Sequence, residues 1–118
     1  MNKNVRIEYS ETFENLSNDL IDHLSQYSSE IKAITDVQNF ITKFESVVES
    51  HPYFCPQSQQ LLNIGVSLFR EYNSPKFKFR LLYRVMEDGN ELVIIGDALL
   101  SQKQDLQQVL VDYCLLHK

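Results

Sequence analysis

The sequence has few of the residues and segments that mark several common protein classes. Its two cysteines, Cys55 and Cys114, are too few for a disulfide scaffold, and we expect both to be reduced and unpaired. Three glycines and three prolines leave little material for a long linker or a low-complexity tail. No apolar run approaches the roughly 18 residues of a membrane span, and the N-terminal segment lacks the apolar core of a signal peptide. We therefore expect a cytoplasmic protein with no membrane contact.

Basic residues are also in deficit. The 118 residues include 11 Lys and Arg against 16 Asp and Glu, which gives a formal net charge of -5. This balance argues against a protein that coats nucleic acid through bulk charge, although it leaves room for a local basic site. The length is that of one domain, so we predict a single domain over residues 1–118.

The first quarter of the chain predicts a strand and a helix. Apolar residues alternate with polar ones over residues 5–9, which is the period of a half-buried strand. Ser10 then stands where a helix cap is expected. Residues 13–27 carry apolar side chains three and four positions apart, ending with Tyr27, so one face of this helix is apolar.

A second helix follows, and its start has two candidate positions. Thr35 and Gln38 form a capping-box pattern, in which each side chain can bind the backbone N–H of the other. An earlier start near Glu30 is the alternative. The helix should end near Ser50, because Pro52 disfavours helical geometry in the residue before it. The two predicted helices form a hairpin.

The second half of the chain predicts three strands after a short turn of helix within residues 57–62. The first strand is expected over residues 66–73. The second, over residues 76–85, has the clearest alternation, with apolar and aromatic side chains on one face and mostly cationic ones on the other. Asp88 and Gly89 then predict a tight hairpin. The third strand should cover residues 92–100.

Two further patterns complete the predicted fold. Gly96 interrupts the last strand, which is typical of a bulge. Ser101 and Gln104 repeat the capping-box pattern and introduce a predicted C-terminal helix over residues 102–117. An N-terminal strand, a two-helix hairpin, a three-stranded antiparallel meander and a final helix define an α+β domain.

A cluster of positive charge lies within this meander. Five of the 11 basic residues fall within fifteen positions, and only Glu71 opposes them. Like charges on one strand face repel, so a binding face for phosphates or an acidic partner is one interpretation. An exposed sheet face kept in solution by its charges is the other. The candidate binding residues are Arg70, Lys76, Lys78, Arg80 and Arg84, with Tyr83, whose hydroxyl could reach the edge of the core.

Residues able to carry chemistry are scarce. Glu71 could act as a general base beside the cations, or it could form an ion pair with Arg70, Arg80 or Arg84. The three histidines have no metal-ligand spacing, and no Cys-x-x-Cys motif is present, so no metal site and no cofactor are predicted. The chain also lacks a glycine-rich phosphate loop and a nucleophile elbow.

Several strand sequences resemble a known family. Residues 68–72 read LFREY, residues 79–85 read FRLLYRV, and residues 93–95 with 99–106 read VII and LLSQKQDL. These segments resemble the RelE/ParE superfamily of toxins from bacterial type II toxin–antitoxin systems, most specifically at residues 80–85. The resemblance covers most of residues 5–106 and implies a growth inhibitor that a cognate antitoxin neutralises.

Two activities occur in that family. ParE-like members bind and poison DNA gyrase, whereas RelE-like members cut mRNA on the ribosome without a metal. For cleavage, the resemblance implies that Arg80 and Arg84 would hold phosphate and Glu71 would be the base. Ribosome-dependent members often carry His or Tyr where this chain has Ser101, and the predicted C-terminal helix extends past the usual family end. We therefore favour gyrase binding, with mRNA cleavage and a non-toxic interaction module as alternatives, and homodimer formation remains open.

Overall fold

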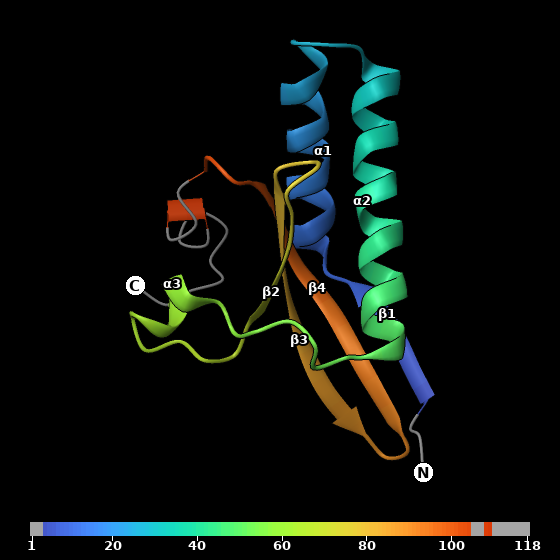
Figure 1. Ribbon diagram of the computed structural model, residues 1–118, viewed down its shortest axis with the longest axis vertical. Helices are drawn as coiled ribbons and strands as arrows, with labels where there is room; N and C mark the ends of the chain where they lie inside the picture. The colour runs from blue at the N-terminus through green and yellow to red at the C-terminus, as the bar shows by residue number, and fades with distance from the viewer. Residues whose placement is uncertain (1–3, 105–107, 110–118) are drawn as a thin grey trace.

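The computed structural model describes residues 4–104 and 108–109. It confirms the α+β class, because two helices follow the first strand and a three-stranded meander follows the helices (Figure 1). In chain order the elements are β1 (Asn4–Tyr9), α1 (Glu11–Ser25), α2 (Glu30–Ser50), α3 (Gln59–Leu62), β2 (Arg70–Ser74), β3 (Phe79–Asp88) and β4 (Glu91–Ser101).

The four strands form one sheet in the order β1-β4-β3-β2. β2, β3 and β4 are joined as antiparallel neighbours, whereas β1 lies parallel to β4 at the far edge. The predicted hairpin between β3 and β4 is confirmed, but its two turn residues are Gly89 and Asn90, because Asp88 still pairs with Glu91. Gly89 has the positive φ of 61° that such a turn favours in glycine.

Both long helices begin at serine caps. The Ser10 hydroxyl accepts a hydrogen bond from the Phe13 N–H at 3.1 Å, as the sequence predicts. α2 is capped by Ser29, so the earlier of its two predicted starts is correct and the start at Thr35 is wrong. Thr35 lies within the helix and donates its hydroxyl hydrogen to the Ile31 carbonyl, because the preceding turn already satisfies the backbone donors that a cap would bind.

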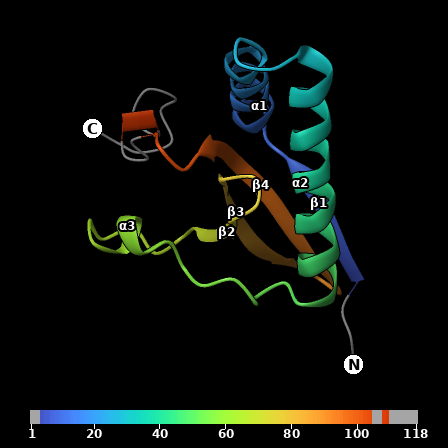
Figure 2. The same ribbon diagram turned by 45° about the horizontal axis from the view of Figure 1, so that its top comes forward.

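Each face of the sheet has its own apolar cluster. Figure 2 shows the α1–α2 hairpin on one side of the sheet, with α3 away from it beside β2. The face toward the hairpin is the helix face, and its buried cluster includes Phe13, Phe40, Phe44, Leu81, Tyr83, Ile94 and Leu99. The other face is called the second face, and its cluster contains Leu61, Phe69, Leu82, Ala98 and Leu100, joined by Leu16 from α1.

β4 contains a bulge beside Gly96. Tyr83 pairs with Gly96 and Leu82 pairs with Ala98, which leaves Asp97 as one extra residue in β4. A Cβ atom on Gly96 would lie only 2.6 Å from the Tyr9 ring, so glycine is required there. The predicted bulge at Gly96 is confirmed, and its consequence is that Asp97 comes within reach of Arg84 on β3.

Other predicted boundaries were wrong. β2 begins at Arg70 rather than at residue 66, and β3 begins at Phe79 rather than at residue 76. Residues 75–78 form the connecting turn, in which Lys78 has a φ of 58°, so the strand alternation could not extend through it. Tyr27 is 78% exposed rather than part of the buried stripe, because α1 ends at Ser25.

Most of the predicted C-terminal helix lies outside the described residues. Its predicted start is described, and the Ser101 N–H donates to the Gln104 Oε1 at 2.8 Å, as a capping box requires. Val109 packs against the apolar cluster of the second face. None of the described helices is long and apolar enough to cross a bilayer.

Candidate functional site

The five basic residues of the predicted positive cluster lie in two parts of the fold, the strands and the turn between them. Arg70 is on β2, and Arg80 and Arg84 are on β3, but Lys76 and Lys78 lie in the β2–β3 turn. The prediction that four of these side chains project from one continuous strand face is therefore wrong. The physical reason is that the turn reverses the chain before Phe79, so the two lysines lie at the end of the sheet.

Arg80 forms a buried ion pair with Glu71 on the second face. Its Nε donates to the Glu71 Oε2 at 3.0 Å and its Nη2 to the Oε1 at 3.1 Å, while Nη2 also donates to the Gln60 Oε1 at 2.5 Å. The Arg80 and Glu71 side chains are only 12% and 13% exposed. Burial alone would raise the pKa of Glu71, but the hydrogen bonds and charge of Arg80 outweigh it and the pKa is lowered.

Arg84 forms the second ion pair of this face, with Asp97 at the bulge. Its Nε donates to the Asp97 Oδ2 at 2.6 Å and its Nη2 to the Oδ1 at 3.0 Å, the two-pronged geometry that arginine favours with a carboxylate. Asp97 is buried, and this burial raises its pKa although Arg84 opposes the shift. The sequence reasoning missed Asp97, and the signal that could have found it is its place directly after the bulge glycine.

Arg70 and Tyr83 hold the loop after α2 against the sheet. The Arg70 Nη1 donates to the Cys55 carbonyl at 2.6 Å and the Tyr53 carbonyl at 3.2 Å, and its guanidinium lies over the Tyr53 ring. The Tyr83 hydroxyl donates to the Pro52 carbonyl at 3.0 Å. Tyr83 is fully buried, which raises its pKa. Its hydroxyl ends against the loop after α2, and that Tyr83 contacts a target or an antitoxin stays a prediction.

A cavity of about 270 Å³ adjoins the Arg80–Glu71 pair, and we name it the Ser58 pocket. The loop before α3, the start of α3, β2 and β3 form its walls. The Ser58 side chain is buried, and its hydroxyl oxygen has no hydrogen-bond partner among the described residues. The residues of this pocket used below are Ser58, Gln60, Glu71, Asn73 and Arg80.

Lys78 of the β2–β3 turn borders a larger groove of about 790 Å³ between the end of α1 and the ends of β3 and β4. We name it the basic groove. Lys78 and Lys103 are exposed on its rim, and Leu24, Tyr27, Phe77 and Phe79 supply its apolar lining. Lys76 is also exposed, with its ammonium 5.2 Å from the Phe77 ring centre. Lys103 was not among the predicted residues, because it follows the last strand and carries no strand periodicity.

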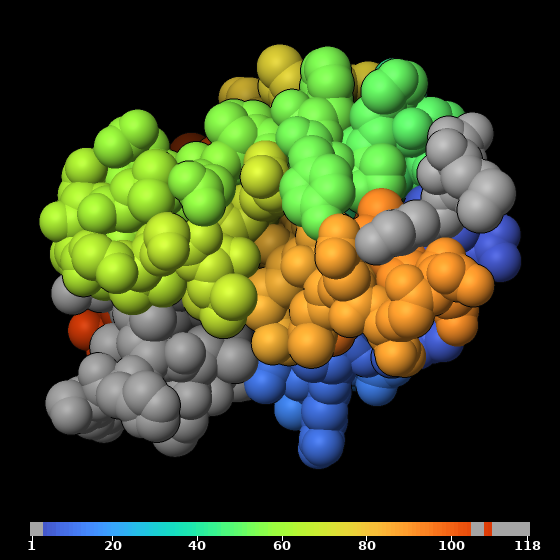
Figure 3. Space-filling view, turned by 90° about the horizontal axis from the view of Figure 1, so that it is seen from below, coloured from blue at the N-terminus to red at the C-terminus, as the bar shows by residue number. Residues whose placement is uncertain are grey.

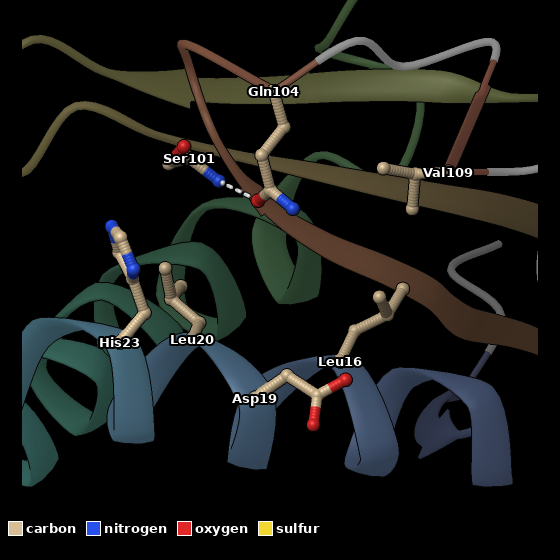
Figure 4. A pocket seen from close by; sticks show the side chains of 7 residues that line it. All are labelled: Leu16, Asp19, Leu20, His23, Ser101, Gln104 and Val109. Atoms are coloured by element: carbon tan, nitrogen blue, oxygen red, sulfur yellow. Dashed lines mark hydrogen bonds between the residues drawn. The ribbon is translucent and has the colours of Figure 1, made fainter.

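A smaller cavity of about 320 Å³ continues from this groove, and the two share His23 and Ser101. Figure 4 shows Leu16, Leu20 and His23 of α1 below Ser101, Gln104 and Val109, with the hydrogen bond between Ser101 and Gln104 marked. The two cavities therefore lie along the same flank of α1.

The opposite end of the molecule presents a different surface. Figure 3 shows the segment from about residue 55 to residue 70 as a lobe beside the β3–β4 hairpin. Large apolar side chains exposed in these regions and in the loop after α2 include Phe54, Leu68 and Met86. Among residues 4–104 and 108–109, no three His, Cys, Asp or Glu side chains are grouped so that they could hold a metal ion. That the protein needs no metal or cofactor stays a prediction.

Comparison with known proteins gives a structural likeness. No family model matches the sequence, and no curated protein matches it. A chain of the "Chromosomal ParDE TA system from P. aeruginosa" superposes with a TM-score of 0.62 at 14% sequence identity, covering 83% of this chain and 96% of that chain. This likeness shows that the two chains share a fold, and it agrees with the fold class predicted from the sequence. Membership of the RelE/ParE superfamily stays a prediction.

Proposed function

We propose that this protein is the growth-inhibiting toxin of a type II toxin–antitoxin pair and that it acts, in the manner of ParE, by binding DNA gyrase. The shared fold with a chain of a ParDE system supports the general assignment. One observation favours binding over chemistry: the three strand arginines already bind groups of the same chain, while the lysines around the basic groove are exposed. Binding a macromolecule requires only a shaped, charged surface.

The antitoxin or the target is proposed to contact the basic groove through Lys76, Lys78 and the newly found Lys103. Their charges can steer an acidic segment, and the apolar lining can bury its hydrophobic side chains. Arg70, Arg80 and Arg84 would contribute only at their partly exposed edges. That the protein forms a homodimer stays a prediction.

The alternative is an mRNA endoribonuclease of the RelE type. The closeness of Glu71 to Arg80 favours it, since a base and a phosphate-binding cation would then lie side by side. The lowered pKa of Glu71 counts against it, because a general base works best with a pKa near the operating pH. A non-toxic interaction module is the third possibility, in which only partner binding is retained.

Induced expression of the intact chain tests these proposals. Growth arrest with accumulated gyrase-dependent DNA damage and intact transcripts is the result expected. Ribosome-dependent transcript cleavage that disappears in Arg80→Ala would replace gyrase binding by the alternative. Normal growth at every expression level would remove the toxin proposal and leave the interaction module.

A matched pair of variants then locates the contact surface. Lys76→Glu combined with Lys103→Glu should relieve growth arrest or prevent neutralisation by the antitoxin. Lys43→Glu changes an exposed lysine on α2 and serves as the control, although it reverses one charge instead of two. If growth arrest and its neutralisation are the same for the double variant, the control and the unchanged chain, the basic groove is excluded as the contact surface.

A further inference from the structure

The Ser58 pocket has an unsatisfied polar group that folding has already removed from water. Ser58 is 1% exposed, and its hydroxyl has no hydrogen-bond partner among the described residues. A buried hydroxyl without a partner is costly, and such groups are rare in folded proteins. The hydroxyl lies beside the Glu71 carboxylate and helps to lower the pKa of that carboxyl. A ligand that enters the pocket would satisfy it.

The charge of the pocket selects the kind of ligand. Arg80 and Glu71 are the charged residues that line it, and they neutralise each other through two hydrogen bonds. A phosphate or a carboxylate would therefore meet no uncompensated cation among the described residues that line the pocket. The remaining polar groups are mainly side-chain amides, including Gln60 and Asn73, which can donate and accept. The Gln60 Oε1 already accepts from Arg80, so Gln60 offers a ligand its NH₂ group. The pocket is suited to a neutral group that also donates and accepts.

The lining also argues against a nucleobase. Proteins usually hold an unpaired base by stacking it on an aromatic ring or a guanidinium plane. No aromatic side chain is among the described residues that line the Ser58 pocket, and the Arg80 guanidinium is held by Glu71 and Gln60. A volume of about 270 Å³ suits one small group. An amide, either a peptide group or the side chain of Asn or Gln, meets these conditions.

The outer edge of β2, beside the pocket, has backbone groups with which a peptide could pair. The loop before α3 pairs with the first half of β2, where the Ser58 N–H donates to the Phe69 carbonyl and the Glu71 N–H donates to the Pro56 carbonyl. Alternation along the strand makes Asn73 the next residue whose backbone N–H and carbonyl point outward. These groups have no strand partner among the described residues. An extended peptide could therefore continue the pairing beside the pocket.

We propose that the Ser58 pocket and the outer edge of β2 at Asn73 bind an extended, neutral peptide segment of a partner protein, with one amide group inserted beside Ser58. The inference does not depend on the proposed growth inhibition. It concerns a surface separate from the basic groove, because the two cavities share no lining residue.

The test is a titration of the isotopically labelled, full-length chain followed through its backbone amide resonances. The probe is N-acetyl-glutamine N-methylamide, with guanosine and inorganic phosphate as separate arms. Saturable shifts at Ser58, Gln60 and Asn73 with the peptide amide alone are expected. Larger shifts there with guanosine or phosphate, or no saturable shift with the amide, would overturn the proposal.

Two variants make the result specific. Ser58→Ala should weaken amide binding at least threefold without lowering the Tm, because the hydroxyl it removes has no partner in the free protein. Asn73→Pro should abolish binding by removing an outward N–H at an edge position where proline is tolerated. Ser46→Ala, on the exposed side of α2, is the control and should bind as the unchanged chain does. Unaltered binding in both test variants would contradict the proposal.

Discussion

The arginines on the second face and the lysines at the basic groove belong to one short stretch of sequence but have different roles. Arg80 and Arg84 are held by carboxylates, with side chains 12% and 29% exposed. Lys76 and Lys78 lie in an exposed turn. Arginine suits the first setting because its planar fork binds a carboxylate at two points, whereas lysine keeps its ammonium hydrated. A cluster of basic residues in the sequence therefore does not identify a binding surface until the intramolecular partner of each side chain is known.

The largest expected effect is the removal of one partner from the buried pair. Glu71→Ala leaves Arg80 without its carboxylate in a poorly solvated site, so we expect a loss of about 3 kcal/mol in the free energy of unfolding. Glu8→Ala, which breaks the exposed pair with Arg6, should cost less than about 1 kcal/mol. Urea unfolding of both variants measures the difference. Similar losses would show that burial does not separate the two ion pairs.

The next effect concerns the bulge that brings Asp97 to Arg84. Gly96→Ala places a Cβ atom 2.6 Å from the Tyr9 ring, and we expect a loss of about 1–3 kcal/mol from this overpacking. Ala98→Gly removes a methyl group from a nearby residue of β4. It tests whether any substitution in this part of the strand lowers the stability by the same amount. Thermal unfolding with amide exchange across β1 and β4 is the measurement. An unchanged Tm for Gly96→Ala would contradict the close contact.

A smaller effect is the pH dependence of the Glu71 pair. The pKa of Glu71 is lowered in the folded protein from 4.5, so its stabilising contribution is present above the unfolded value and is lost as the pH falls through the folded one. The penalty for Glu71→Gln should therefore be larger at about pH 6 than at about pH 3. Asp97 acts in the opposite direction because its pKa is raised. A penalty for Glu71→Gln that does not change with pH would contradict the lowered pKa.

The smallest effect on stability is expected at the basic groove. Lys76→Glu with Lys103→Glu should change the free energy of unfolding by less than about 0.5 kcal/mol per site, because both side chains are exposed. Any effect should instead concern the proposed binding. Chemical unfolding of this variant beside Glu71→Ala compares the two regions directly, and a comparable loss in both would remove the distinction between them.

Much of the fold follows from local patterns in the sequence. The period of residues 5–9 predicts β1, Ser10 caps α1, and Gly89 lies in the β3–β4 turn. Gly96 marks the bulge. These features depend on backbone geometry and short-range hydrogen bonds, so neighbouring residues suffice to predict them. The start of β3 was misplaced because alternation continues through the turn at residues 75–78, where the chain has already left the sheet.

The candidate site depended on contacts that no local pattern contains. Alternation places Glu71 on the same face as Arg80 and Arg84, and the register opposite Leu82 makes both arginines its diagonal neighbours. The sequence therefore leaves the choice between them open. Arg84 forms its ion pair with Asp97, which is distant in sequence, and Arg80 forms the pair with Glu71.

The sequence by itself determined which strand residues face the helices, where the first helix begins and where β4 bulges, because these depend on periodicity and on glycine. The tertiary structure alone decided which carboxylate neutralises each arginine, which lysines stay exposed, and that Ser58 is buried without a partner. Those outcomes depend on strand register and on how the loop before α3 packs against β2. Both bring together residues far apart in the chain.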